Sequence, residues 1–149
     1  VNAPFYNMED GSVMTVFRYK EQHQSYPGRV HGGMITAMLD EMGLRSLWAK
    51  ELSEETFGVT ISLDTKYRKP VPYETELIGR GVVVKNTSHF IITDSYIMDK
   101  DGEILANGRI KYIKMDTQKI QEGVEVHEEM PYLVEDGRTE IEGPFFDNL

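Results

Sequence analysis

The residues best suited to chemistry lie in the stretch 26–43, which reads Tyr-Pro-Gly-Arg-Val-His-Gly-Gly-Met-Ile-Thr-Ala-Met-Leu-Asp-Glu-Met-Gly. His31, Gly32 and Gly33 directly precede an apolar helical run, and Asp40 follows nine positions after the histidine. The first N–H groups of a helix have no partner within the helix and carry partial positive charge. Because glycines leave these amides uncovered, a carbonyl oxygen or an anion could bind there.

Two acids on this helix differ in their local surroundings. Glu41 has Arg45 one turn later, which is the spacing of an ordinary ion pair along a helix. Asp40 has Thr36 and Leu44 one turn away on either side and therefore no local countercharge. Two interpretations stay open. Asp40 is a functional carboxylate, or it is hydrogen-bonded to Thr36 or to a neighbouring strand and does no chemistry.

The composition excludes several kinds of site. A chain of 149 residues with 40% hydrophobic residues is expected to form one folded domain. The absence of cysteine excludes disulfides, a thiolate nucleophile and a cysteine zinc site. His23, His89 and His127 lack the spacing of metal ligands, so we expect no metal. A net charge of −9 argues against nucleic acid as a partner.

The sequence also bears on location and cofactors. No apolar run approaches the ~20 residues that cross a bilayer, and the N-terminus lacks a signal-peptide pattern. We therefore expect a cytoplasmic protein with no membrane partner. No phosphate-binding loop or dinucleotide fingerprint is present, and we expect no cofactor.

The elements that must position these residues follow from hydrophobic periodicity. Residues 1–11 read as a loop or short helix, and the helix is expected to run to about Trp48. Strands are expected at 12–19, 57–67, 74–85, 88–98 and 104–115. A long helix with strands joined by short turns is an α+β layout, in which an antiparallel sheet covers the helix with one face.

Two strands carry more detailed predictions. Alternation in 57–67 should place Val59, Ile61 and Leu63 on one face and Thr60, Ser62 and Asp64 on the other. Gly79 and Gly81 suggest a bulge or strong curvature in 74–85.

The His-Gly-Gly triplet, the apolar helix and the Asp nine positions later resemble the signature of hotdog-fold acyl-CoA thioesterases. The closest likeness is to the phenylacetate-pathway type within the 4-hydroxybenzoyl-CoA thioesterase superfamily. The lead-in loop 23–28 also resembles that family. The resemblance covers residues 12–115 and implies a hotdog fold, with an antiparallel sheet wrapped around the long helix. It implies a single domain, 1–149, with a core at about 12–115 and an acidic C-terminal extension at 116–149.

The resemblance also assigns roles within the site. The acid on the family's helix is the nucleophile or the general base for water, and this role falls on Asp40. The amide after the histidine, at Gly32 with Gly33 as a second candidate, would bind the thioester oxygen. His31 would be a further catalytic residue that orients the loop and could contact the thioester carbonyl. A hydroxyl on the second predicted strand, at Thr60, would hold the water or the acid.

Substrate contacts are implied in the same way. Phenylacetate-type relatives carry Asn six residues before the histidine, where this chain has Ser25, so Ser25 or the adjacent Gln24 would take its place. Arg68 and Lys69, next to Lys66, lie where relatives meet the nucleotide end of CoA. CoA is part of the substrate and not a cofactor.

The family's site lies between subunits, so the resemblance implies a homodimer or a homotetramer built as a dimer of dimers. Asp40 of one chain would then face Gly32 of the other. Thioester hydrolysis on an acyl-CoA is the leading hypothesis. Two alternatives stay open, an enoyl-thioester hydratase and a non-catalytic module that binds acyl-CoA.

Overall fold

A computed structural model describes residues 3–50 and 56–116. The expected acidic extension lies outside these residues, apart from Asp116, and the single-domain boundary at 149 stays a prediction. The described elements are β1 (Tyr6–Asn7), β2 (Val13–Phe17), the short 3₁₀ helix η1 (Glu21–His23), α1 (Gly32–Lys50), β3 (Thr56–Tyr67), β4 (Leu77–Asn86), β5 (Phe90–Met98) and β6 (Ile104–Asp116).

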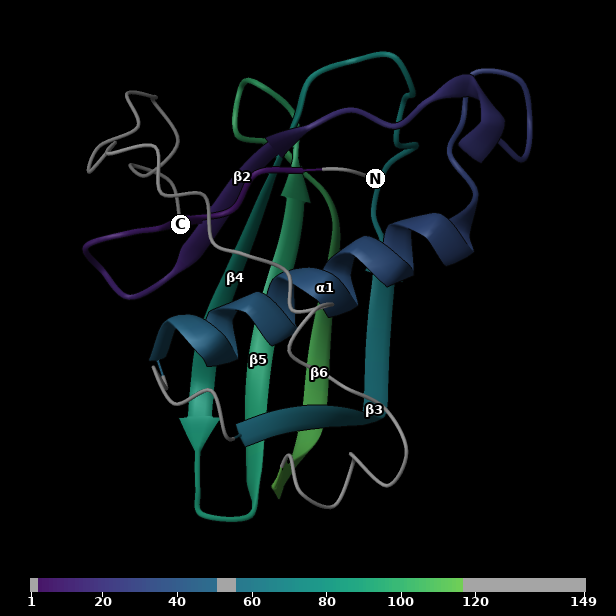
Figure 1. The fold of residues 1–149 in the computed structure, drawn as a ribbon. Helices are drawn as coiled ribbons and strands as arrows, with labels where there is room; N and C mark the ends of the chain where they lie inside the picture. The colour runs from purple at the N-terminus through teal and green to yellow at the C-terminus, as the bar shows by residue number, and fades with distance from the viewer. Residues whose placement is uncertain (1–2, 51–55, 117–149) are drawn as a thin grey trace, which may run out of the picture.

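The described strands form one antiparallel sheet in the order β1-β2-β4-β5-β6-β3, and α1 lies across one face of it. Figure 1 shows the helix in front of the strands, with β3 at one edge. The expected α+β class and the hotdog arrangement are confirmed. Among the described residues, the face of the sheet opposite α1 is not covered by a helix. Strand β3 lies at an end of the sheet and is paired on one side only, with β6.

The prediction of a loop or short helix in residues 1–11 was wrong for Tyr6–Asn7, which form β1 and pair with β2. The reason is a tight turn at Asp10 and Gly11. The N–H and hydroxyl of Ser12 both donate to Asp10 Oδ1, and Gly11 adopts a positive φ of 81°. The turn folds the chain back on itself and so creates a strand that periodicity alone did not indicate.

The core lies between α1 and the sheet, where Leu39, Met42 and Leu47 are fully buried. Gly79 and Gly81 serve this contact, and of the two predicted features, a bulge or strong curvature, the bulge does not lie at these glycines. A Cβ on Gly81 would collide with the main-chain oxygen of Met42. The irregularity of β4 lies instead between Val83 and Lys85. The glycines therefore let the helix approach the sheet closely.

The face assignment predicted for the second long strand was also wrong, because β3 carries a bulge between Thr60 and Ser62. The extra residue shifts the alternation, so that Thr60 and Leu63 both face α1. Ile61 points to the opposite face and is 49% exposed. The bulge brings the Thr60 hydroxyl to the helix.

No helix within 3–50 and 56–116 is long and apolar enough to cross a membrane.

Candidate functional site

The start of α1 is held by the loop that precedes it. The His31 N–H donates to the His23 carbonyl at 2.8 Å, and the Val30 N–H donates to the Val71 carbonyl at 2.9 Å. The His31 side chain caps the helix, because its Nδ1 accepts from the Gly33 N–H at 2.9 Å. In a neutral ring this acceptor role places the proton on Nε2. His31 therefore fixes the entry of the helix.

These contacts leave one amide of the first turn available. The Gly33 N–H is engaged by His31 Nδ1, and the N–H groups of Met34 and Ile35 both donate to the His31 carbonyl, at 2.9 and 3.2 Å. Among the described residues, the Gly32 N–H donates no hydrogen bond. Its own peptide group is polarised by the two bonds that the His31 carbonyl accepts. Gly32 is therefore a better candidate than Gly33 to bind a carbonyl oxygen.

Asp40 lies two turns further along α1 and is half-buried. The Thr60 hydroxyl lies 2.9 Å from Asp40 Oδ1 and 3.2 Å from Oδ2, so one proton is shared by the two carboxylate oxygens. The partner of Asp40 is thus a neighbouring strand and not Thr36, which contacts the Tyr67 hydroxyl at 2.7 Å. The hydroxyl of Tyr112 donates to the Asp40 main-chain oxygen at 2.8 Å.

The neighbouring acid behaves as expected. Arg45 Nε lies 2.7 Å from Glu41 Oε1, which confirms the predicted ion pair. Among the described residues no Lys, Arg or His nitrogen lies within ion-pair distance of Asp40. Within the described part of the chain, the Asp40 side chain therefore has a hydroxyl donor and no paired cation.

Gly32 and Asp40 cannot act on one thioester within a single chain. They lie eight positions apart on one helix, and a rise of 1.5 Å per residue separates them by about 12 Å. A carbonyl carbon lies little more than 1 Å from the oxygen that an amide holds. The described chain therefore carries both candidate groups but does not bring them together.

The remaining predicted residues lie at the edges of this region. Gln24 and Ser25 are exposed in the turn before His31, and their backbones pair with Val30 and Arg29. At the far end of β3, Arg68 Nε donates to Asn107 Oδ1, and Lys69 forms an ion pair with Glu103. The structure therefore gives the Arg68 and Lys69 side chains partners within the chain.

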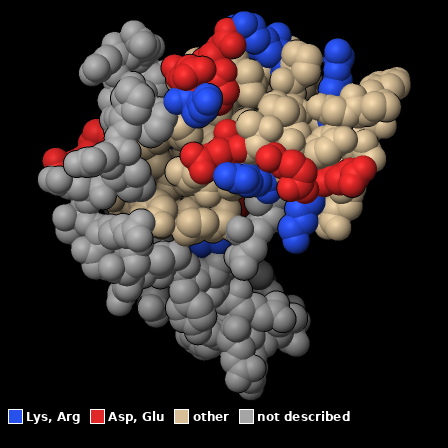
Figure 2. All heavy atoms as spheres, turned by 90° about the horizontal axis from the view of Figure 1, so that it is seen from above, with Lys and Arg blue, Asp and Glu red and all other residues tan. Residues whose placement is uncertain are grey.

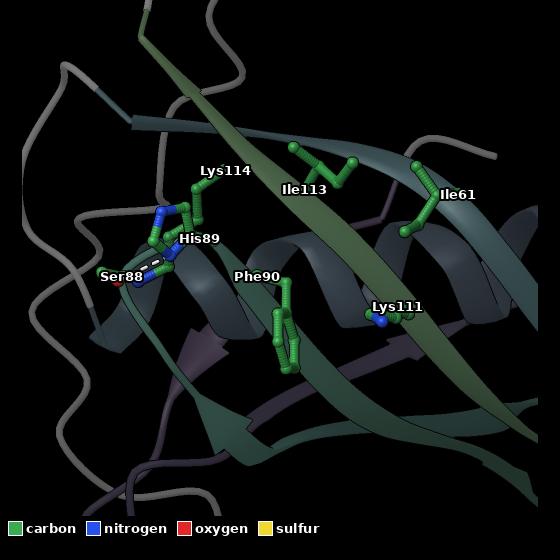
Figure 3. Close-up of a pocket in the computed structure, with 7 residues that line it drawn as sticks. All are labelled: Ile61, Ser88, His89, Phe90, Lys111, Ile113 and Lys114. Carbon is green, nitrogen blue, oxygen red and sulfur yellow. Dashed lines mark hydrogen bonds between the residues drawn. The ribbon is translucent and has the colours of Figure 1, made fainter.

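A recess that sequence reasoning missed lies on the sheet face opposite α1. Figure 3 shows its lining, which comes from β3, β5, β6 and the β4–β5 turn: Ile61, Ser88, His89, Phe90, Lys111, Ile113 and Lys114. Its volume is about 360 Å³. The ammonium groups of Lys111 and Lys85 lie 4.4 and 5.5 Å from the centre of the Phe90 ring. An aromatic ring flanked by cations is suited to a planar, negatively charged ligand.

Figure 2 shows acidic and basic side chains interspersed over one face of the molecule. By contrast, the described lining of the recess includes Lys111 and Lys114 and no acidic residue. In the sequence, the recess is indicated only by basic residues that are spaced three or four positions apart near the ends of two strands. Its assembly depends on Phe90 pairing with Ile113 across β5 and β6, a register that the sequence did not indicate.

The chain is similar to known thioesterases. A profile of the family described as the thioesterase superfamily matches residues 27–106, which is more than half of the chain. Acyl-coenzyme A thioesterase 13 of Homo sapiens is 23% identical over 100 residues, which are 66% of this chain and 70% of that protein.

Solved structures agree with the sequence match. A crystal structure of a thioesterase superfamily protein aligns with a TM-score of 0.66 at 26% identity, over 74% of this chain and 55% of that one, so this chain spans about half its length. A Streptococcus mutans UA159 protein, solved bound to acetyl CoA, aligns with a TM-score of 0.67 at 18% identity, over 78% of this chain and 90% of that one. The second likeness supports the fold alone.

Proposed function

This chain belongs to the thioesterase superfamily, a family of thioester hydrolases, and we propose that it hydrolyses acyl-CoA thioesters at a site shared by two copies of the chain. The observation that carries the proposal is the pair of groups on α1. An unused amide at Gly32 can hold the thioester oxygen, and the Asp40 carboxylate can act on the carbonyl carbon. The phenylacetate-pathway subtype stays a prediction.

Strand β3 supports the shared site, because it offers a long edge for pairing. It has 12 residues and is an end strand of the sheet. Two of its apolar side chains, Val59 and Ile61, are 41% and 49% exposed. An edge strand of this length, with unpaired N–H and C=O groups, is a template for another strand. A second copy of β3 is the natural partner in a symmetric dimer.

The contacts of β3 with α1 support this proposal. Thr60 touches the helix at Asp40, and Tyr67 touches it at Gly32, so strand and helix run in opposite directions. A two-fold axis through the middle of β3, near Leu63, would exchange the two ends of the strand. Gly32 of one copy would then lie beside Asp40 of the other.

The proposed chemistry begins with the thioester oxygen at the Gly32 N–H of one copy. Asp40 of the other copy removes a proton from water, whose oxygen adds to the carbonyl carbon. The negative oxygen of the tetrahedral intermediate is stabilised by the Gly32 amide. The C–S bond then breaks, and the CoA thiolate takes the proton back from Asp40. Direct attack by Asp40 would use the same geometry, would expel the CoA thiolate and would leave a mixed anhydride between Asp40 and the acyl group. If water then cleaved this anhydride at the Asp40 carbonyl carbon, a single turnover would place solvent oxygen in the Asp40 carboxylate.

The Thr60 hydroxyl is proposed to aim the Asp40 carboxylate. Thr60→Val keeps the shape of the side chain and removes the donor. We expect kcat to fall about 10- to 100-fold, since a hydrogen bond to a charged group contributes roughly 1.5–3 kcal/mol. Thr60→Ser keeps the hydroxyl and should stay close to wild type. Steady-state kinetics on one acyl-CoA measure both, and equal activity of Thr60→Val and wild type would remove this role.

We propose that the recess lined by Phe90 receives the nucleotide end of CoA. The ring can stack on a base, and Lys111 can neutralise a phosphate group, whereas Lys114 already donates to Asn86 Oδ1. Arg68 and Lys69, the residues expected to do this, already contact Asn107 and Glu103 and are weaker candidates.

Reversing one charge in the recess tests this placement. Lys111→Glu should raise KM for acyl-CoA about tenfold, because an attractive charge becomes repulsive, and the effect should shrink as salt is added. Lys100→Glu makes the same change at the exposed β5–β6 turn and should leave KM unchanged. Equal KM values for the two variants would place the nucleotide elsewhere.

The alternatives are separated by one assay, the release of free thiol from a panel of acyl-CoAs. The chain has no cysteine, so the thiol reagent meets no background from the protein. Binding of CoA thioesters without thiol release would favour the non-catalytic module. Addition of water to an enoyl-CoA with the thioester retained would favour the hydratase, which is less well supported because the His31 Nδ1 is occupied by Gly33.

A further inference from the structure

In the part of the chain that the structure describes, three tyrosine hydroxyls donate hydrogen bonds to main-chain oxygens of α1. The donor–acceptor pairs are Tyr67 to Gly32 at 3.1 Å, Tyr112 to Asp40 at 2.8 Å and Tyr19 to Met34 at 3.1 Å. Two of the three acceptors belong to the residues that carry the proposed chemistry. Tyr67 lies on β3 and Tyr112 on β6, so two separate strands hold the helix at its two reactive points.

Each of these two phenols reaches the helix beside a glycine. A Cβ on Gly32 would lie 3.3 Å from the Tyr67 hydroxyl oxygen, and a Cβ on Gly43 would overlap the Tyr112 hydroxyl. No described glycine has a corresponding close approach to Tyr19. Glycines at two positions of the sequence thus allow a phenol to pack closely against the helix, one near Gly32 and one near Asp40.

The Tyr112 hydroxyl is suited to act as a permanent donor. Burial, together with the nearby charge of Asp40, raises the pKa of Tyr112 well above its ordinary value, so the phenol keeps its proton. Tyr67 is 55% exposed, and its hydroxyl also contacts the Thr36 hydroxyl at 2.7 Å. A hydrogen bond to one carbonyl has a preferred direction, whereas the apolar contacts under the helix are non-directional.

Two-fold symmetry makes the position of the helix along its own axis important. The helices of two copies paired through β3 run in opposite directions. If each helix moved along its axis by a given distance, Gly32 of one copy and Asp40 of the other would separate by twice that distance. Since a misplacement of ~1 Å can cost about 10²-fold in rate, small shifts would matter.

We propose that Tyr67 and Tyr112 are positioning residues that fix the two segments of α1 around Gly32 and Asp40 along the helix axis, and thereby bring the Gly32 amide of one copy to the Asp40 carboxylate of the other. The proposal rests on the proposed function. Tyr19 makes the same kind of bond, but its acceptor is the carbonyl of Met34, which has no proposed part in the reaction. Tyr19 therefore supplies a matched control.

Kinetics of Tyr67→Phe, Tyr112→Phe and Tyr19→Phe test the proposal. Each variant loses one hydroxyl and keeps its ring. We expect kcat to fall roughly tenfold in the first two variants, because the reacting groups are misaligned, while KM stays near wild type because substrate contacts remain. Tyr19→Phe should lower thermal stability as much as Tyr112→Phe and leave kcat near wild type.

Several results would overturn the proposal. These are an unchanged kcat in both Tyr67→Phe and Tyr112→Phe, a rise in KM alone, or an equal loss of kcat in Tyr19→Phe. Because Tyr67 is partly exposed, Tyr67→Phe gives a result even if Tyr112→Phe does not fold. Failure of the proposed function is distinguishable, since wild-type protein would then release no thiol from any acyl-CoA.

Discussion

Asp40→Asn should keep its fold and lose thioester turnover by about 10²–10⁴-fold, the usual contribution of a positioned general base. The amide has nearly the shape of the carboxylate, and its oxygen can still accept the Thr60 hydrogen bond. It cannot take a proton from water or attack the carbonyl carbon. KM should change little, because the lost interaction belongs to the chemical step. Free-thiol release and thermal unfolding measure the two properties separately.

Glu41→Gln supplies the matched control. It makes the same chemical change at the next residue of the helix, where the carboxylate is paired with Arg45. Because Glu41 has no proposed part in the reaction, its variant should turn over at close to the wild-type rate. If Asp40→Asn retained wild-type kcat, or if Glu41→Gln lost as much, the acid of the site would be misassigned.

Gly32→Pro should lower kcat by about 10²–10³-fold, the cost of losing one oxyanion donor. Proline has no N–H, so the substitution deletes the one amide that the first turn leaves unused. Proline is well tolerated at the first position of a helix, and the residue before it is expected to be extended, as an N-cap such as His31 normally is. Tm should therefore change little, and kcat should report the missing donor.

Gly32→Ala distinguishes the effect of the amide donor on turnover from the effect of added bulk at this position. Alanine keeps the N–H and adds a Cβ 3.3 Å from the Tyr67 hydroxyl oxygen. Its loss of kcat should be much smaller than that of Gly32→Pro. Equal losses would mean that crowding against Tyr67, and not the amide, governs turnover at this position.

The sequence predicts the parts of this site that depend on local spacing. His31, Gly32 and Asp40 lie on one continuous segment, so their positions at the start and in the middle of α1 follow once the helix is recognised. The ion pair of Glu41 with Arg45 is a further local feature that was confirmed. The hotdog arrangement followed from the order of one long helix and several strands, and from the family resemblance.

The parts that were missed depend on contacts between distant segments. A single extra residue in β3 reverses the faces of Thr60 and Ile61, and nothing in an alternating sequence marks where a bulge will form. The recess beside Phe90 needs the register of β5 with β6. Tyr112 reaches Asp40 across 72 positions of the chain, and only the packing of the helix on the sheet brings them together.

The shared site is the central claim, because Gly32 and Asp40 are too far apart on one helix to act together.

The most direct test joins two inactive variants in one dimer. Copies carrying Asp40→Asn and Gly32→Pro are co-expressed with different tags, and the mixed dimer is isolated by both tags in turn. One of its sites combines the intact Asp40 with the intact Gly32, and the other carries both defects. A shared site predicts that the mixed dimer recovers about half of the wild-type activity, since one of two equivalent sites is whole. A mixed dimer as inactive as its two parents, or the failure of the two copies to associate, would contradict it.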